Sequence, residues 1–179
     1  MLLPGEAVTV MVFGKLPAHG DFVARGIAPD VQAEIDGWLA QEMARARTVH
    51  GAAFERLFDH APVWRFTWAQ GASAWSGAMS PSTDRIGRRY PVIAGVAAGG
   101  NQAALACEDQ LYAALVEQWS VDTLHDAIKA IPTDAANAPV SSRWWTEGND
   151  DFAPASLDGD RPADLIATML TPRGEREWA

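Results

Sequence analysis

The order of expected elements along this 179-residue sequence predicts an α/β fold in which helices cover both faces of one sheet. Two short runs, residues 8–13 and 90–96, carry apolar side chains on both alternating faces, which is typical of strands buried on both sides. Stretches with apolar residues at helical spacing follow each run. The length fits one domain, which we expect to span residues 1–172, with a flexible tail at 173–179.

The first half of the chain is expected to form strands and two helices. Pro29 suits the first position of a helix because its fixed φ is helical, and Gly51 marks that helix's end. Trp64, Phe66 and Trp68 alternate along one face of an expected strand. In order, the expected elements are a strand at 8–13, helices at 29–49 and 52–60, and hairpin strands at 63–68 and 74–79 that turn at Gly71. The longer helix is expected to bury Val31, Ile35, Trp38, Leu39 and Met43.

The second half is expected to be mainly helical. Adjacent residues of a strand point to opposite sides, so at least one of Trp144 and Trp145 is expected at the surface. The acidic segment 150–160 is expected to be irregular. In order, the expected elements are a strand at 90–96, helices at 102–119 and 121–131, a loop at 133–142, a strand at 142–146 and a helix at 162–169. The first of these helices is expected to bury Ala104, Leu105, Leu111, Leu115 and Trp119.

Composition and charge exclude several classes of protein. The net charge of −9 lies in the second half: residues 1–100 hold nine acidic and nine basic side chains, residues 101–179 fourteen and five. Nucleic-acid binding is not expected, because it requires a basic surface. A run long enough for a membrane helix and a basic secretory leader are both absent, and the single cysteine fits a reducing compartment. We therefore expect a cytoplasmic protein without membrane insertion; no motif sets its oligomeric state.

Lys15, His19 and Asp21 form a polar group directly after the first expected strand. Ligands usually bind near the carboxyl ends of strands in open α/β sheets. Lys15 could bind an anion there, with His19 and Asp21 as acid and base. The alternative is a rigid turn in which Asp21 caps backbone amides. The glycine spacing of nucleotide-binding loops is absent.

A second polar loop, at 81–91, contains Ser82, Asp84, Arg85 and Arg88 and carries a net charge of +2. Guanidinium groups bind phosphate and carboxylate through two parallel hydrogen bonds, so the loop predicts an anion or partner site. Alternatively, Asp84 pairs with an arginine of its own loop and caps the turn. The sequence lacks hydrolase and zinc-protease motifs and clustered metal ligands, so no catalytic residue, cofactor or metal is predicted.

The two motifs occur together in a specific order. Residues 13–22, a helix segment at 36–39 (Asp-Gly-Trp-Leu) and residues 77–91 together resemble the TagF (ImpM) family of type VI secretion system-associated proteins. The resemblance implies a cytoplasmic protein with a three-layer α-β-α sandwich around a mixed sheet and no established catalytic activity. It also implies a post-translational regulator, generally a repressor, that acts with the forkhead-associated scaffold protein of the secretion system.

Two hypotheses about function result. The first is a non-enzymatic binding module whose partner or anion surface combines the two loops, provided that both leave carboxyl strand ends and converge. The second is a hydrolase or phosphate-ligand enzyme that uses Lys15, His19 and Asp21 with an anion clamp of Arg85 and Arg88. The second hypothesis requires these side chains to be free of internal salt bridges. The residues proposed for the binding surface are Lys15, His19, Asp21, Ser82, Asp84, Arg85 and Arg88.

Overall fold

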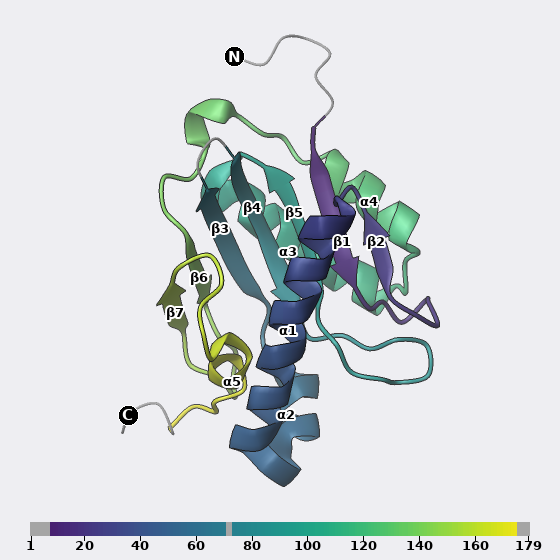
Figure 1. Cartoon of the computed structure of the whole chain (residues 1–179), viewed down its shortest axis with the longest axis vertical. Coiled ribbons are helices and arrows are strands. Elements are labelled where there is room, and N and C mark those ends of the chain that lie inside the picture. The colour runs from purple at the N-terminus through teal and green to yellow at the C-terminus, as the bar shows by residue number, and fades with distance from the viewer. Residues whose placement is uncertain (1–7, 71–72, 175–179) are drawn as a thin grey trace.

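The computed structural model describes residues 8–70 and 73–174, and these form one seven-stranded sheet between two layers of helices (Figure 1). The strands are β1 (Val10–Gly14), β2 (Val23–Arg25), β3 (Trp64–Gln70), β4 (Ser73–Ser80), β5 (Val92–Ala97), β6 (Arg143–Thr146) and β7 (Ala155–Asp158). They are ordered β2-β1-β5-β4-β3-β6-β7. The expected turn at Gly71 lies outside the described residues.

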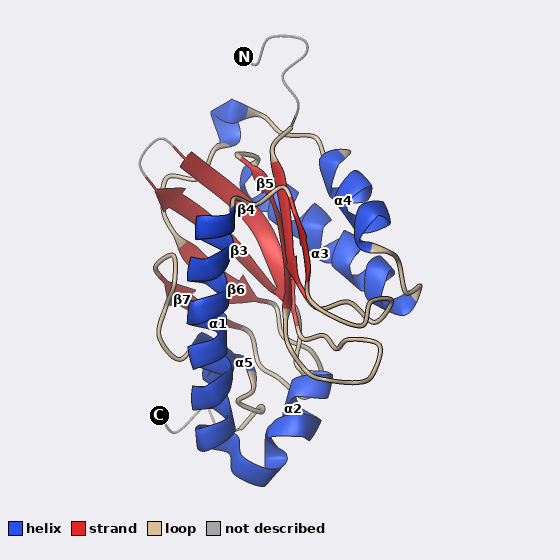
Figure 2. Cartoon of the chain, turned by 45° about the vertical axis from the view of Figure 1, so that its right-hand side comes forward, coloured by secondary structure: helices blue, strands red, loops and turns tan. Residues whose placement is uncertain are grey.

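Helices cover both faces of this sheet, as expected. The helices are α1 (Pro29–His50), α2 (Phe54–His60), α3 (Gly100–Val116), α4 (Val121–Lys129) and α5 (Leu165–Met169), with short 3-10 turns η1 (Gly51–Ala53) and η2 (Ala135–Asn137). Helices α1, α2 and α5 share one hydrophobic core with the sheet, and α3 and α4 share a second core on the opposite face. Figure 2 shows α1 and the pair α3 and α4 on opposite sides of the strands. The α/β class and the three layers are therefore confirmed.

The sheet differs from the expected mixed sheet because every pairing in it is antiparallel. Strands β1 and β4 run in the same direction, but β5 lies between them and pairs antiparallel with both. A parallel contact between the two is thereby prevented. The order of elements along the chain does not reveal this insertion, which depends on where the chain re-enters the sheet.

The aromatic strand face expected at β3 is the centre of the larger core. Trp64, Phe66 and Trp68 are all buried on the α1 side. The ring of Trp144 from β6 lies 4.8 Å from the Phe66 ring, centroid to centroid, and is fully buried, whereas Trp145 is half-buried. The two adjacent tryptophans differ in burial, as expected, but Trp145 is only partly exposed rather than at the open surface.

Several local expectations are wrong. Val31 and Leu105 are exposed rather than buried. Helix α3 approaches the sheet through small residues such as Ala103 and Cys107, so Leu105 falls outside the buried stripe. The helix expected to reach Trp119 ends at Val116. The segment 150–160 is not irregular throughout, because it contains β7, which pairs with β6 at the edge of the sheet formed by the described residues.

The sheet also determines where the two polar motifs lie. Because β1 and β4 run in the same direction, their carboxyl ends open at the same end of the sheet. The first motif follows β1 and the second follows β4, and Figure 1 shows the loop after β4 projecting from the body of the molecule. Among the described residues, no helix has the length and apolar character needed to cross a membrane.

Candidate partner-binding site

The two polar loops are joined by direct hydrogen bonds. The Ser82 hydroxyl donates to the backbone oxygen of Lys15 at 2.7 Å, a contact between residues 67 positions apart. The backbone N–H of Arg85 donates to the His19 oxygen at 2.8 Å. The convergence expected from the sequence is therefore confirmed.

The Asp84 carboxylate is the centre of this junction. Its Oδ2 accepts from Lys15 Nζ at 3.0 Å and from Arg88 Nε at 2.6 Å. Its Oδ1 accepts from the backbone N–H groups of Ile86 at 3.1 Å and of Arg88 at 3.0 Å. Burial of the carboxyl acts to raise its pKa, but the hydrogen bonds from Arg88 and Lys15 favour the charged form more strongly and hold the pKa well below its usual range.

Three further contacts attach the first loop to its surroundings. The Arg85 guanidinium donates through Nη2 to the Ala18 oxygen, and that of Arg88 donates through Nη2 to the Gly20 oxygen, both at 2.8 Å. The Nε2 of His19 accepts the backbone N–H of Val121, at the start of α4, at 2.9 Å. The second loop and α4 thus hold the first loop from two sides.

An aromatic cluster adjoins the two loops and includes Phe22, which is itself 45% exposed. The Phe22 ring stacks parallel to Phe13, with centroids 6.0 Å apart, and meets Tyr90 edge-on at 4.8 Å. The Tyr90 hydroxyl donates to Oδ1 of Asp36 at 2.6 Å. Burial and this hydrogen bond both raise the pKa of Tyr90. Asp36 belongs to the helix segment that completes the family resemblance, so all three segments meet here.

The proposed site residues divide into an inner and an outer group. Lys15, Ser82 and Asp84 are buried, and their polar atoms are bonded within the protein. His19 is half-buried, with its Nε2 occupied by Val121. The residues that remain exposed are Asp21, Arg85 and Arg88.

The outer group differs in its pairing. Arg85 forms no ion pair within the described residues, whereas Arg88 pairs with Asp84 through Nε while its side chain stays 55% exposed. Within the described residues, Oδ1 of Asp21 accepts one hydrogen bond, from the backbone N–H of its neighbour Phe22. The exposed side chain of Ile86 was not among the residues predicted from the sequence, although an apolar residue between charged neighbours in a turn was a usable signal.

The family model for the TagF N-terminal domain, described as type VI secretion system-associated, matches residues 11–163. The chain belongs to the TagF family. The TagF match includes both polar loops and most of the acidic second half, and it makes the chain an accessory protein of that secretion system rather than a member of a known enzyme family.

A solved structure has a similar fold. The chain resembles the crystal structure of PA0076 from Pseudomonas aeruginosa PAO1, with a TM-score of 0.76 and 24% sequence identity. The alignment covers 90% of this chain and 94% of that one. The likeness shows a shared fold. A search of curated proteins found no match.

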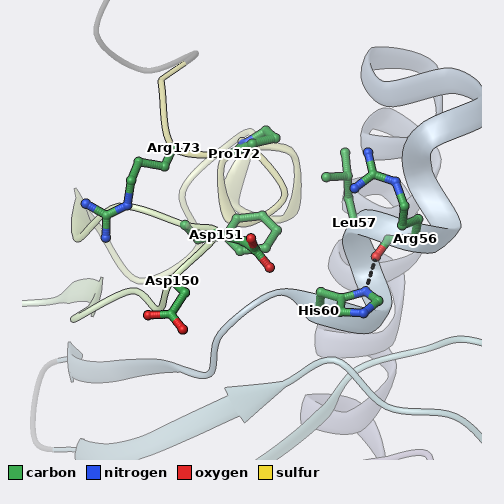
Figure 3. Close-up of a pocket in the computed structure, with 8 residues that line it drawn as sticks. Arg56, Leu57, His60, Asp150, Asp151, Pro172 and Arg173 are labelled. Atoms are coloured by element: carbon green, nitrogen blue, oxygen red, sulfur yellow. Dashed lines mark hydrogen bonds between the residues drawn. The ribbon is translucent and has the colours of Figure 1, made fainter.

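A hollow of about 500 Å³ lies elsewhere on this TagF chain and contains no residue of the two loops (Figure 3). It lies between α2 and the segments before and after α5 and mixes charges of both signs. His60 Nδ1 donates to the Arg56 oxygen at 2.8 Å, so this nitrogen is already occupied. No cluster suited to a metal ion occurs in the described parts of the chain. The residues lining the hollow are Arg56, Leu57, His60, Asp150, Asp151, Phe152, Pro172 and Arg173.

Proposed function

We propose that this TagF protein is a non-enzymatic cytoplasmic regulator that represses the type VI secretion system after translation by binding its forkhead-associated scaffold protein. The observation that supports this proposal is the exposed guanidinium of Arg85, which has no carboxylate partner within residues 8–70 and 73–174. It lies on a loop that the buried carboxylate of Asp84 holds in place. An unpaired cation on a fixed loop in an acidic protein is suited to contact an acidic partner.

The internal contacts argue against the alternative enzyme. The alternative enzyme needs Lys15 and the clamp cations Arg85 and Arg88 to be free of internal salt bridges. The Lys15 ammonium is buried against Asp84 and Arg88 pairs with the same carboxylate, so among the described residues Arg85 is the one member of these three without an ion pair. A general base needs an unoccupied nitrogen facing the substrate, but Nε2 of His19 accepts the Val121 N–H. These contacts support a role of the inner residues in holding the loops.

Secretion of a marker effector tests the proposed function. Deletion of the gene is expected to increase secretion, and the wild-type gene is expected to restore repression. A gene that carries Arg85→Glu is expected not to restore repression, because the reversed charge at position 85 repels an acidic partner. Arg173→Glu is a matched control, since Arg173 is also exposed and its guanidinium also bonds one backbone oxygen, that of Asn149.

Two results would contradict this proposal. Unchanged secretion after deletion removes the repressor role. A pull-down of the scaffold protein that survives reversal of both Arg85 and Arg88, on variants that remain folded, removes the loops from the partner surface.

A further inference from the structure

We infer that the loop between β4 and β5 docks on its protein partner by inserting Ile86 into an apolar hollow rimmed by carboxylates. This inference rests on the proposed function, whose partner surface it specifies. The Ile86 side chain is 72% exposed between the flanking cations Arg85 and Arg88. A single exposed apolar residue is common on protein surfaces and needs no explanation by itself. The fixed geometry of the turn that presents Ile86 is the reason to assign it a role.

Arg85 and Ile86 occupy the two central positions of a β-turn. The backbone N–H of Gly87 donates to the Asp84 oxygen at 2.9 Å and closes the turn. Gly87 has a φ of 84°, a conformation that glycine adopts without a steric cost. At these positions Ile86 is exposed to solvent, whereas the Arg85 guanidinium also reaches back to the Ala18 oxygen of the first loop.

The base of the turn is fixed on both sides. Thr83 and Arg89 form an antiparallel bridge, and the Tyr90 N–H donates to the Ser82 oxygen at 3.0 Å. The Ile86 N–H itself donates to the buried carboxylate of Asp84. A loop fixed in this way loses little conformational entropy on binding, so an exposed apolar side chain at its tip is well suited to act as an interface anchor.

Charge around the tip indicates the chemistry of the partner. Lys15 and Arg88 share one carboxylate, that of Asp84, and Arg85 adds a further positive charge. The exposed carboxylate of Asp21 in the first loop offsets one of these charges, so the joined loops keep a small net positive charge. Each of the two arginines uses one Nη2 on a backbone oxygen and retains other N–H donors. Carboxylates around an apolar hollow would satisfy these donors and receive Ile86. The second half of the chain, residues 101–179, is acidic. Its negative charge would repel the partner's carboxylates and so disfavour orientations in which this half faces the partner.

A lipid surface fits these observations less well. One isoleucine and two arginines supply little of the apolar area and charge that membrane anchoring needs. The net charge of −9 also repels an anionic bilayer. We therefore favour a protein partner.

Calorimetric titration of the purified scaffold protein with the full-length chain tests the inference. Ile86→Asp is expected to weaken binding about tenfold or more, the loss typical of an interface anchor. Val140→Asp is the matched control, because Val140 is 97% exposed in the loop before β6, and its affinity is expected to be unchanged. Arg85→Glu is expected to weaken binding to the wild-type partner. Replacement of a carboxylate residue at the rim of the partner's hollow by lysine is expected to restore the affinity for this variant. Melting temperatures near that of the wild type verify folding, since all three substituted side chains are exposed.

The outcomes separate the two proposals. If the wild type binds the scaffold protein and Ile86→Asp binds equally well, the docking inference is overturned while the proposed function stands. If the wild type does not bind, the partner assignment fails and the inference fails with it. If Ile86→Asp loses binding to phosphatidylserine-containing vesicles but not to the scaffold protein, the tip is a membrane contact and the inference is overturned.

Discussion

The ammonium nitrogen of Lys15 lies 3.0 Å from Oδ2 of Asp84, and this ion pair joins two loops whose residues are 69 positions apart. Both side chains are buried. Removal of one member of a buried pair leaves the other charge without its partner and away from water, which is costly. The pair therefore fixes the two loops against each other, and the exposed side chains of the second loop depend on it.

Lys15→Met is expected to lower the melting temperature, because methionine fills similar space but offers no charge to Asp84. Arg85→Ala is the comparison, since Arg85 is exposed and has one hydrogen bond to a backbone oxygen. We expect the lysine substitution to reduce the melting temperature clearly more than the arginine substitution. Thermal unfolding followed by circular dichroism measures both; equal reductions would show that the buried pair does not stabilise the junction.

Stability should depend on pH through Asp84. Its pKa in the folded protein lies below the ordinary value of 3.8, so its contribution is fully present above that value and is lost as the pH falls through the folded pKa. The melting temperature of wild type should exceed that of Asp84→Asn by a constant margin from about pH 5 to about pH 7 and by a shrinking margin below about pH 4. A margin independent of pH down to full acid unfolding would contradict this.

His19→Ala is expected to destabilise the protein by about 1 kcal/mol, because the Val121 N–H loses its acceptor. Urea unfolding measures the change. Amide hydrogen exchange at Val121 should also become faster. If stability falls while exchange at Val121 does not change, His19 acts through another contact.

Gly77→Ala is expected to destabilise the sheet by about 3 kcal/mol, the upper end of the cost of overpacking. A Cβ at Gly77 would lie 2.2 Å from the Ala94 oxygen and 2.6 Å from Cζ of Phe66. Gly37→Ala in α1 is the control, since no atom lies within 4 Å of its added Cβ. It should stabilise the helix by about 0.5–1 kcal/mol. Chemical denaturation compares the two; a neutral Gly77→Ala would contradict the close packing of β4 on Phe66.

Local signals explain which elements the sequence predicts well. Helix α1 has Pro29 at its start and a buried stripe at helical spacing, and β3 has three aromatic residues on one face. Strands β2 and β7 have three and four residues at the sheet edges. Their side chains are largely exposed or half-buried, so they leave no periodic pattern to read.

The candidate site was located by sequence, but the roles of its members were not. Lys15 and Arg85 are both cations in polar loops and look alike as sequence. In the structure one is buried against a carboxylate and the other is exposed. The difference depends on which residue from the other loop is adjacent, and no local pattern encodes that contact.

The sequence by itself determined the α/β class, the main helices and strands and the two polar motifs, because periodicity and turn residues act over a few neighbouring positions. Tertiary structure alone decided that β5 separates β1 from β4, that Lys15 and Asp84 pair inside the protein, and that Ile86 and Arg85 remain at the tip. Each of these depends on contacts between segments tens of residues apart, which form only when the sheet assembles and its two cores are buried.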